Sequence, residues 1–177
     1  MKKFKIDFSF LILLGIIALS PKQFILLKLL FCLFIHEIGH LFFVFIFHYK
    51  IENLKLSLFG FFLKLSPTKR ECIKDVFLYA GGILMNALCI LIIPDASIRK
   101  ISLLLILFNS LPIYPLDGFN VIHSILSYFF PYKLVLKSMG LLSVILSIGT
   151  LLICIVCRVD VFIICNSVYL FLLSLIY

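Results

Sequence analysis

Three residues that could do chemistry lie together in the stretch "FIHEIGHLF", residues 34 to 42. His36 and His40 are four residues apart, so on a helix they lie one above the other, close enough to share a metal ion. Glu37 lies on the adjoining edge of the same helix. In this HExxH pattern two imidazoles bind zinc and the glutamate takes a proton from the attacking water. We therefore predict His36 and His40 as zinc ligands and Glu37 as the catalytic base.

A simpler explanation is that these are buried polar residues that bridge helices. The stretch lies at the centre of an apolar run from Phe24 to Phe47, however, and a glutamate at membrane depth is costly without a partner or a function. The functional interpretation is therefore favoured.

A catalytic zinc site needs a third protein ligand and an open position for water. Most other acidic residues lie in loops or near helix ends, whereas Asp117 lies in "NSLPIYPLDGFN", which continues the apolar run from Ile101. Pro112 and Pro115 break the helix before it, and irregular backbone at membrane depth is tolerated only beside protein or water. Asp117 is thus the best candidate for the third ligand. A proline kink with a packing role is the alternative.

The composition places these elements in a bilayer. Of 177 residues 64% are hydrophobic, and twenty are Phe, which leaves too little polar surface for a soluble globule. The apolar runs are 8 to 20, 24 to 47, 76 to 93, 101 to 126, 138 to 157 and 159 to 176. Several approach the roughly 20 residues that span a membrane. The prediction is an all-α polytopic membrane protein of about six transmembrane helices, with residues 1 to 177 forming a single domain.

The net charge of +8 does not indicate nucleic-acid binding, because the cations lie in short loops between apolar runs. With the N-terminus inside, eleven Lys and Arg residues are cytoplasmic and four are outside, which favours this orientation. His40 and Asp117 then both fall in the inner half of the membrane. Residues 1 to 20 also resemble a signal peptide, but Pro21 after the cleavage pattern favours retention of this segment as a helix.

The one long polar connection, from His48 to Asp75, contains "KLSLFGFFLKLS", residues 55 to 66. Its alternation on either side of Phe59 and Gly60 predicts two short strands in a membrane-associated hairpin. An amphipathic surface segment whose lysines meet lipid headgroups is an equally good reading. The six cysteines, including the CxxC at Cys154, are interpreted as packing residues.

Taken together, "HEIGH" followed by "NSLPIYPLDG" resembles the site-2 protease family of intramembrane zinc metalloproteases, and in particular its sporulation branch of the stage IV sporulation protein FB type. "AGGILMN", residues 80 to 86, is similar to a glycine-and-asparagine motif of that family. The resemblance implies that Asn109 and Asn86 contact the substrate backbone or support the site, and that the hairpin adds a substrate strand to its edge. Some sporulation-type members also carry a regulatory domain, and we expect none in these 177 residues.

The resemblance implies an intramembrane zinc metalloprotease of the bacterial cytoplasmic membrane. Its expected partners are the lipid bilayer and a membrane-associated protein substrate, for which a sigma-factor precursor during sporulation is one option and an inhibitory membrane partner a further one. Two other functions stay open from the residues alone. A zinc transporter would use the same ligands as a transit site, and a catalytically silent membrane chaperone would bind single-span partners without needing Glu37.

Overall fold

The structure is a computed structural model that describes residues 3–6, 19–57, 60–65, 72–156 and 161–176. The described helices are α2 (Gln23–Ile46), α3 (Cys72–Ile92), α4 (Ala96–Asn109), α5 (Asp117–Phe129), α6 (Tyr132–Val156) and α7 (Val161–Ile176). The described strands are β1 (Lys3–Ile6), β2 (Ile51–Ser57) and β3 (Gly60–Leu65). The predicted first helix, residues 8 to 20, falls almost entirely outside the described residues.

Three of the described helices, α2, α3 and α6, are long and apolar enough to cross a membrane. The other three are shorter, with 14 residues in α4, 13 in α5 and 16 in α7. At 1.5 Å per residue these lengths correspond to about 20 to 24 Å, less than the roughly 30 Å of a hydrocarbon core. The structure is therefore consistent with a helical membrane protein, with three candidate spans among the described helices.

The apolar run from 101 to 126, in which the sequence analysis expects prolines to break the helix before Asp117, forms two separate helices. Helix α4 begins earlier, because the Asp95 carboxylate caps it and accepts hydrogen bonds from the backbone N–H groups of Ser97 and Ile98. It ends at Asn109, and α5 begins at Asp117. Two prolines lie in the connection, and proline cannot donate the backbone hydrogen bond that a helix interior requires. The break thus places Asp117 in the first turn of a new helix.

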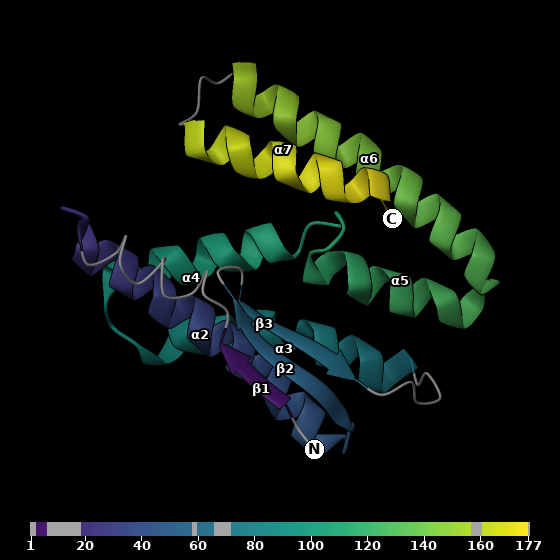
Figure 1. The fold of residues 1–177 in the computed structure, drawn as a ribbon, viewed down its shortest axis with the longest axis horizontal. Coiled ribbons are helices and arrows are strands. Elements are labelled where there is room, and N and C mark those ends of the chain that lie inside the picture. Colours follow the sequence, from purple (N-terminus) through teal and green to yellow (C-terminus); the bar gives the residue numbers. More distant parts are fainter. Residues whose placement is uncertain (1–2, 7–18, 58–59, 66–71, 157–160, 177) are drawn as a thin grey trace.

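The helices form two connected groups (Figure 1). Helices α2, α3 and α4 pack against one another, and α6 and α7 form an antiparallel pair. Helix α5 lies between the groups, in contact with α3 on one side and α6 on the other. Helices α2 and α3 approach closely at Gly39 and Gly81, where a methyl group on either glycine would overlap the carbonyl of the other. This close approach brings the HExxH face of α2 against α3.

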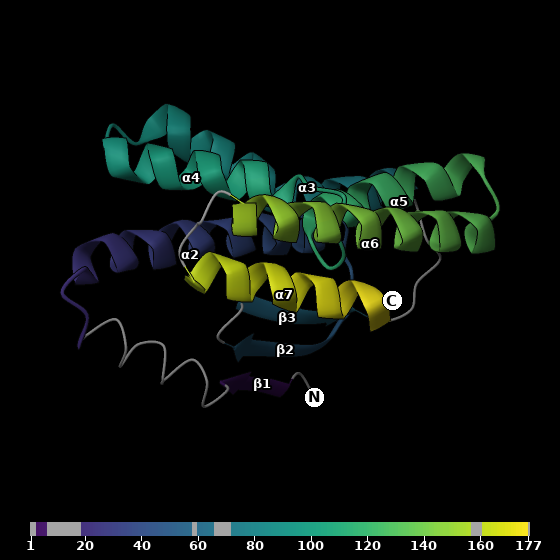
Figure 2. The same ribbon diagram turned by 90° about the horizontal axis from the view of Figure 1, so that it is seen from above.

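The three strands form one sheet in the order β1-β2-β3. Strands β2 and β3 pair antiparallel across residues 51 to 65, the region in which the sequence predicts a hairpin. Strand β1 pairs parallel to β2 and lies in the segment that resembles a signal peptide, where the sequence predicts no strand. Figure 2 shows the sheet beneath the helices, with β3 nearest to them and β1 farthest away. Strand β3 also contacts α2.

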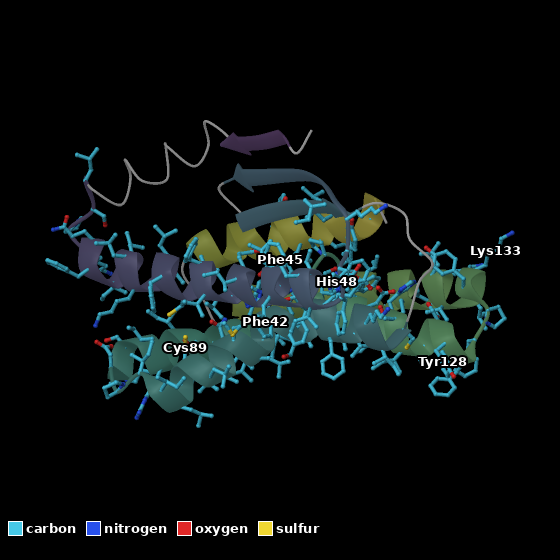
Figure 3. The ribbon with its side chains drawn as sticks, turned by 90° about the horizontal axis from the view of Figure 1, so that it is seen from below. Phe42, Phe45, His48, Cys89, Tyr128 and Lys133 are labelled. Atoms are coloured by element: carbon cyan, nitrogen blue, oxygen red, sulfur yellow. The ribbon has the colours of Figure 1, made fainter. Side chains whose placement is uncertain are left out.

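The helix surfaces are covered with apolar side chains. Phe45 is 66% exposed, Tyr128 72% and Leu91 76%, and many more Leu, Ile and Phe side chains are similarly open. An apolar surface of this extent is not stable in water and matches contact with lipid. Figure 3 shows Lys133 at one end of the long axis and Cys89 in the opposite half, and α2, α3 and α6 extend along this axis.

Candidate metal centre

Helix α2 places the two histidines of the HExxH motif side by side. Nε2 of His40 lies 3.3 Å from Nε2 of His36, and the two rings meet edge to face with centroids 4.9 Å apart. His36 is buried and His40 is half-buried. The spacing of four residues therefore places the two rings on one face of the helix, as the sequence predicts, with their Nε2 atoms close to each other.

Asp117 supplies the third donor at this point from the first turn of α5. Its Oδ2 lies 3.0 Å from Nε2 of His36 and 3.3 Å from Nε2 of His40. The three donor atoms thus form a triangle with edges of 3.0, 3.3 and 3.3 Å. Donors about 2.0 to 2.1 Å from a tetrahedral zinc ion lie roughly 3.3 to 3.4 Å apart. The residues consequently fit the metal that the sequence predicts.

The electrostatics of the triangle also favour a cation. Nδ1 of His40 donates to the carbonyl oxygen of Leu78 at 2.8 Å, because a carbonyl can only accept. A neutral His40 therefore turns the lone pair of Nε2 toward Asp117. Oδ2 of Asp117 is buried and has no hydrogen bond of suitable geometry among the described residues. Electron-rich atoms that face one another at this distance repel unless a cation lies between them.

The other described acidic residues are engaged elsewhere. Asp75 accepts a hydrogen bond from the hydroxyl of Tyr49 at 2.7 Å. Asp95 pairs with Lys28 at 2.6 Å while it caps α4. The Lys28 ammonium and the backbone N–H groups of the cap lower the pKa of this carboxylate. Among the described residues, His36, His40 and Asp117 are the one set of this kind close enough to hold a metal ion.

Glu37 is half-buried and follows His36 directly on α2. It lies one helical step from His36, and it is not among the three residues whose ligand atoms converge. Its role as the base for an attacking water remains a prediction.

The connection before Asp117 is anchored by the α6–α7 pair. The backbone N–H of Tyr114 donates to the hydroxyl of Ser143 on α6 at 2.8 Å. Ile113 is fully buried and packs with Leu116 and Leu170, the last from α7. After Asp117, Gly118 lies so close to the carbonyl of Ser110 that a side chain at this position would overlap it. The backbone is therefore fixed by contacts both before and after Asp117.

The two asparagines of the sequence analysis lie in different surroundings. Asn109 is half-buried at the end of α4, and its side-chain amide donates to the carbonyl of Leu105 in the same helix. Asn86 is fully buried, with Nδ2 3.2 Å from Nδ1 of His36. Both roles remain predictions, but only Asn86 has a described contact with a metal-facing residue.

Sequence reasoning missed the Leu78 carbonyl and the Ser143 hydroxyl. Leu78 acts through its backbone, so its side chain gives no signal. Ser143 is a buried hydroxyl in an apolar helix, which is a weak indication of a hydrogen-bonding role. Either contact could be recognised only after the helices were placed.

Comparisons with known proteins identify the architecture. No family model matches the sequence. No curated protein matches it significantly either. Among solved structures, the chain is similar to the site-2 protease from Methanocaldococcus jannaschii, with a TM-score of 0.68 and 19% sequence identity. The match covers 98% of this chain and 89% of that one. At this identity the likeness establishes a shared fold, so the chain has the fold of a site-2 protease.

Proposed function

We propose that this chain is an intramembrane zinc metalloprotease of the site-2 protease type. The observation that carries the proposal is the convergence of His36, His40 and Asp117 on one point with the spacing of a tetrahedral zinc site. Three protein ligands leave a fourth position open, as catalytic zinc sites do. The shared fold with a site-2 protease adds independent support.

Each residue of the site has a separate role in the proposed peptide hydrolysis. A bound zinc ion would supply Lewis-acid activation of the scissile carbonyl and of water. Glu37 accepts the proton of the attacking water and delivers it to the leaving amine nitrogen. His36, His40 and Asp117 would bind the metal ion. The apolar helices around them limit the entry of bulk water.

The site lies within the bilayer in this proposal. Helices α4 and α5, each too short alone, cross it together as one interrupted span, with the loop between them sheltered by α6 and α7. Counting this interrupted segment, α7 and the predicted first helix gives about six spans. The excess of Lys and Arg in one set of loops orients the N-terminus toward the cytoplasm of a bacterial cytoplasmic membrane.

The proposed substrate is a membrane-associated protein segment in an extended conformation. A helical amide is sheltered by its own hydrogen bonds, so a substrate helix must unwind before hydrolysis. The outer edge of β3 faces the helices and pairs with no strand among the described residues, so it can accept an added strand. A sigma-factor precursor of a sporulating cell is the specific candidate that the sequence resemblance suggests.

Co-expression with membrane-tethered candidate substrates, including a sigma-factor precursor, tests this function. Wild type and Glu37→Gln are compared by immunoblot for a shortened product. His48→Asn is the matched control, because His48 is exposed, lies outside the triangle and has a positive φ of 56° that asparagine tolerates.

A product formed by wild type and His48→Asn but not by Glu37→Gln supports the protease. A product that Glu37→Gln also forms would contradict the role of Glu37. If no variant forms a product while wild type still binds zinc, a zinc transporter or a catalytically silent chaperone becomes the better explanation.

A further inference from the structure

One face of α3 contacts both histidines of α2. Leu78, Gly82 and Asn86 recur every four residues, so they lie in one row along this helix. The Leu78 carbonyl accepts from Nδ1 of His40, and the Asn86 amide lies 3.2 Å from Nδ1 of His36. Each histidine therefore turns one nitrogen toward α3 and the other toward Asp117.

Gly82 lies between these two contacts and leaves room for the His36 ring. A side-chain carbon at position 82 would overlap Cε1, Nε2 and Nδ1 of His36 together. The imidazole thus occupies the space that any larger residue at this position would fill. The His36 ring therefore packs directly against the backbone of Gly82 and also contacts the side chain of Asn86.

Asn86 can meet Nδ1 of His36 in two ways, because its amide can donate through Nδ2 or accept through Oδ1. As placed, Nδ2 of Asn86 faces Nδ1 of His36, and Oδ1 of Asn86 is buried without a hydrogen-bond partner among the described residues. Rotating the amide by 180° keeps its shape and presents Oδ1 to Nδ1. Nδ1 of His36 then donates to Asn86, as Nδ1 of His40 donates to Leu78.

We propose that Asn86 is a positioning residue for the metal site, which accepts a hydrogen bond from Nδ1–H of His36 and so presents the lone pair of Nε2 to the metal. Gly82 supplies the space that this ring orientation needs. The proposal rests on the proposed zinc site and deepens it. Metal-ligating histidines usually donate their second ring N–H in this way, and loss of such a partner costs roughly 10- to 100-fold in metal affinity.

Zinc affinity, measured by chelator competition on purified full-length protein, is the first test. Asn86→Leu removes the acceptor at similar volume, and we expect binding weaker by about 10- to 100-fold. Asn86→Asp retains an acceptor for Nδ1–H and should restore affinity to at least the wild-type level. Ser102→Ala is the control, because Ser102 is equally buried but contacts Cys32 instead of a histidine. If Asn86→Leu does not fold, Asn86→Ala replaces it.

Gly82→Ala tests the steric half of the proposal and should also weaken zinc binding. Gly149→Ala is its control, since a side-chain carbon at Gly149 meets nothing within 4 Å. The tautomer is read separately from ¹⁵N shifts of labelled histidine in metal-free protein. We expect His36 protonated at Nδ1 in wild type and at Nε2, at least in part, in Asn86→Leu.

Three outcomes separate the two proposals. Weaker zinc binding in Asn86→Leu with rescue by Asn86→Asp supports the positioning role. Unchanged affinity and an unchanged His36 tautomer in Asn86→Leu overturn it, while loss of zinc on His36→Ala keeps the metal site. A wild-type protein that binds no zinc overturns the metal site itself.

Discussion

Oδ2 of Asp117 lies 3.0 Å from Nε2 of His36, although the two residues belong to different helices. His36 is carried by α2, which packs against α3, while Asp117 begins α5, which also packs against α3. The site is therefore assembled across three helices, and its geometry depends on the packing of α3 against both others.

Asp117→Asn should abolish tight zinc binding. The substitution keeps the size of the side chain but removes the negative charge that offsets the metal. Loss of a direct ligand should exceed the roughly 10- to 100-fold cost of losing a supporting hydrogen bond. Zinc per chain after gel filtration measures the effect. Asp75→Asn is the matched control, because Asp75 bonds Tyr49 away from the triangle, and it should retain wild-type zinc content.

Ser143→Ala should destabilise the protein and loosen the loop before Asp117. The backbone N–H of Tyr114 loses its acceptor in a half-buried position, which costs about 1 to 3 kcal/mol for an unsatisfied buried donor. A lower Tm in detergent measures the change. Ser138→Ala serves for comparison, since Ser138 is exposed and bonds only within α6. Equal Tm values for the two variants would show that the loop does not depend on Ser143.

The Lys28–Asp95 pair should give the protein a small pH-dependent stability. The folded pKa of Asp95 lies below its unfolded value, chiefly because of the Lys28 hydrogen bond. Its contribution is present above the unfolded pKa and is lost as the pH falls through the folded pKa. Asp95→Asn keeps an N-cap residue but removes the charge. We expect a lower Tm for the variant at pH 7, with a difference that shrinks below about pH 4.

High salt should also reduce that difference, because the pair is partly exposed and open to screening. A Tm difference that is independent of both pH and salt would show that the variant acts through packing.

The sequence predicts the local part of the site better than the long-range part. The pairing of His36 with His40 follows from the helix period alone, and both rings meet as expected. Asp117 could be selected because it is an acidic residue inside an apolar run, next to prolines that interrupt a helix. The contacts from Leu78, Gly82 and Ser143 depend on how helices distant in sequence cross, which periodicity does not encode.

In the fold, too, local features are easier to predict from the sequence than long-range ones. The apolar runs predict helices, but they do not fix where helices end. The Asp95 cap, which places the start of α4 at Ala96, is set by two local hydrogen bonds, and Asp before a helical segment is its sequence signal. Strand β1 is only four residues long and is stabilised by pairing with β2, so its own sequence gives little indication of it.

X-ray absorption spectroscopy at the zinc edge on purified Glu37→Gln protein tests the central claim most directly, because this variant should keep the metal without turnover. We predict one zinc ion per chain with only nitrogen and oxygen ligands at about 2.0 to 2.2 Å, lost in the variant that also carries His36→Ala. A protein without zinc, or a spectrum dominated by sulfur at about 2.3 Å from cysteines such as Cys32 and Cys89, would contradict the assignment.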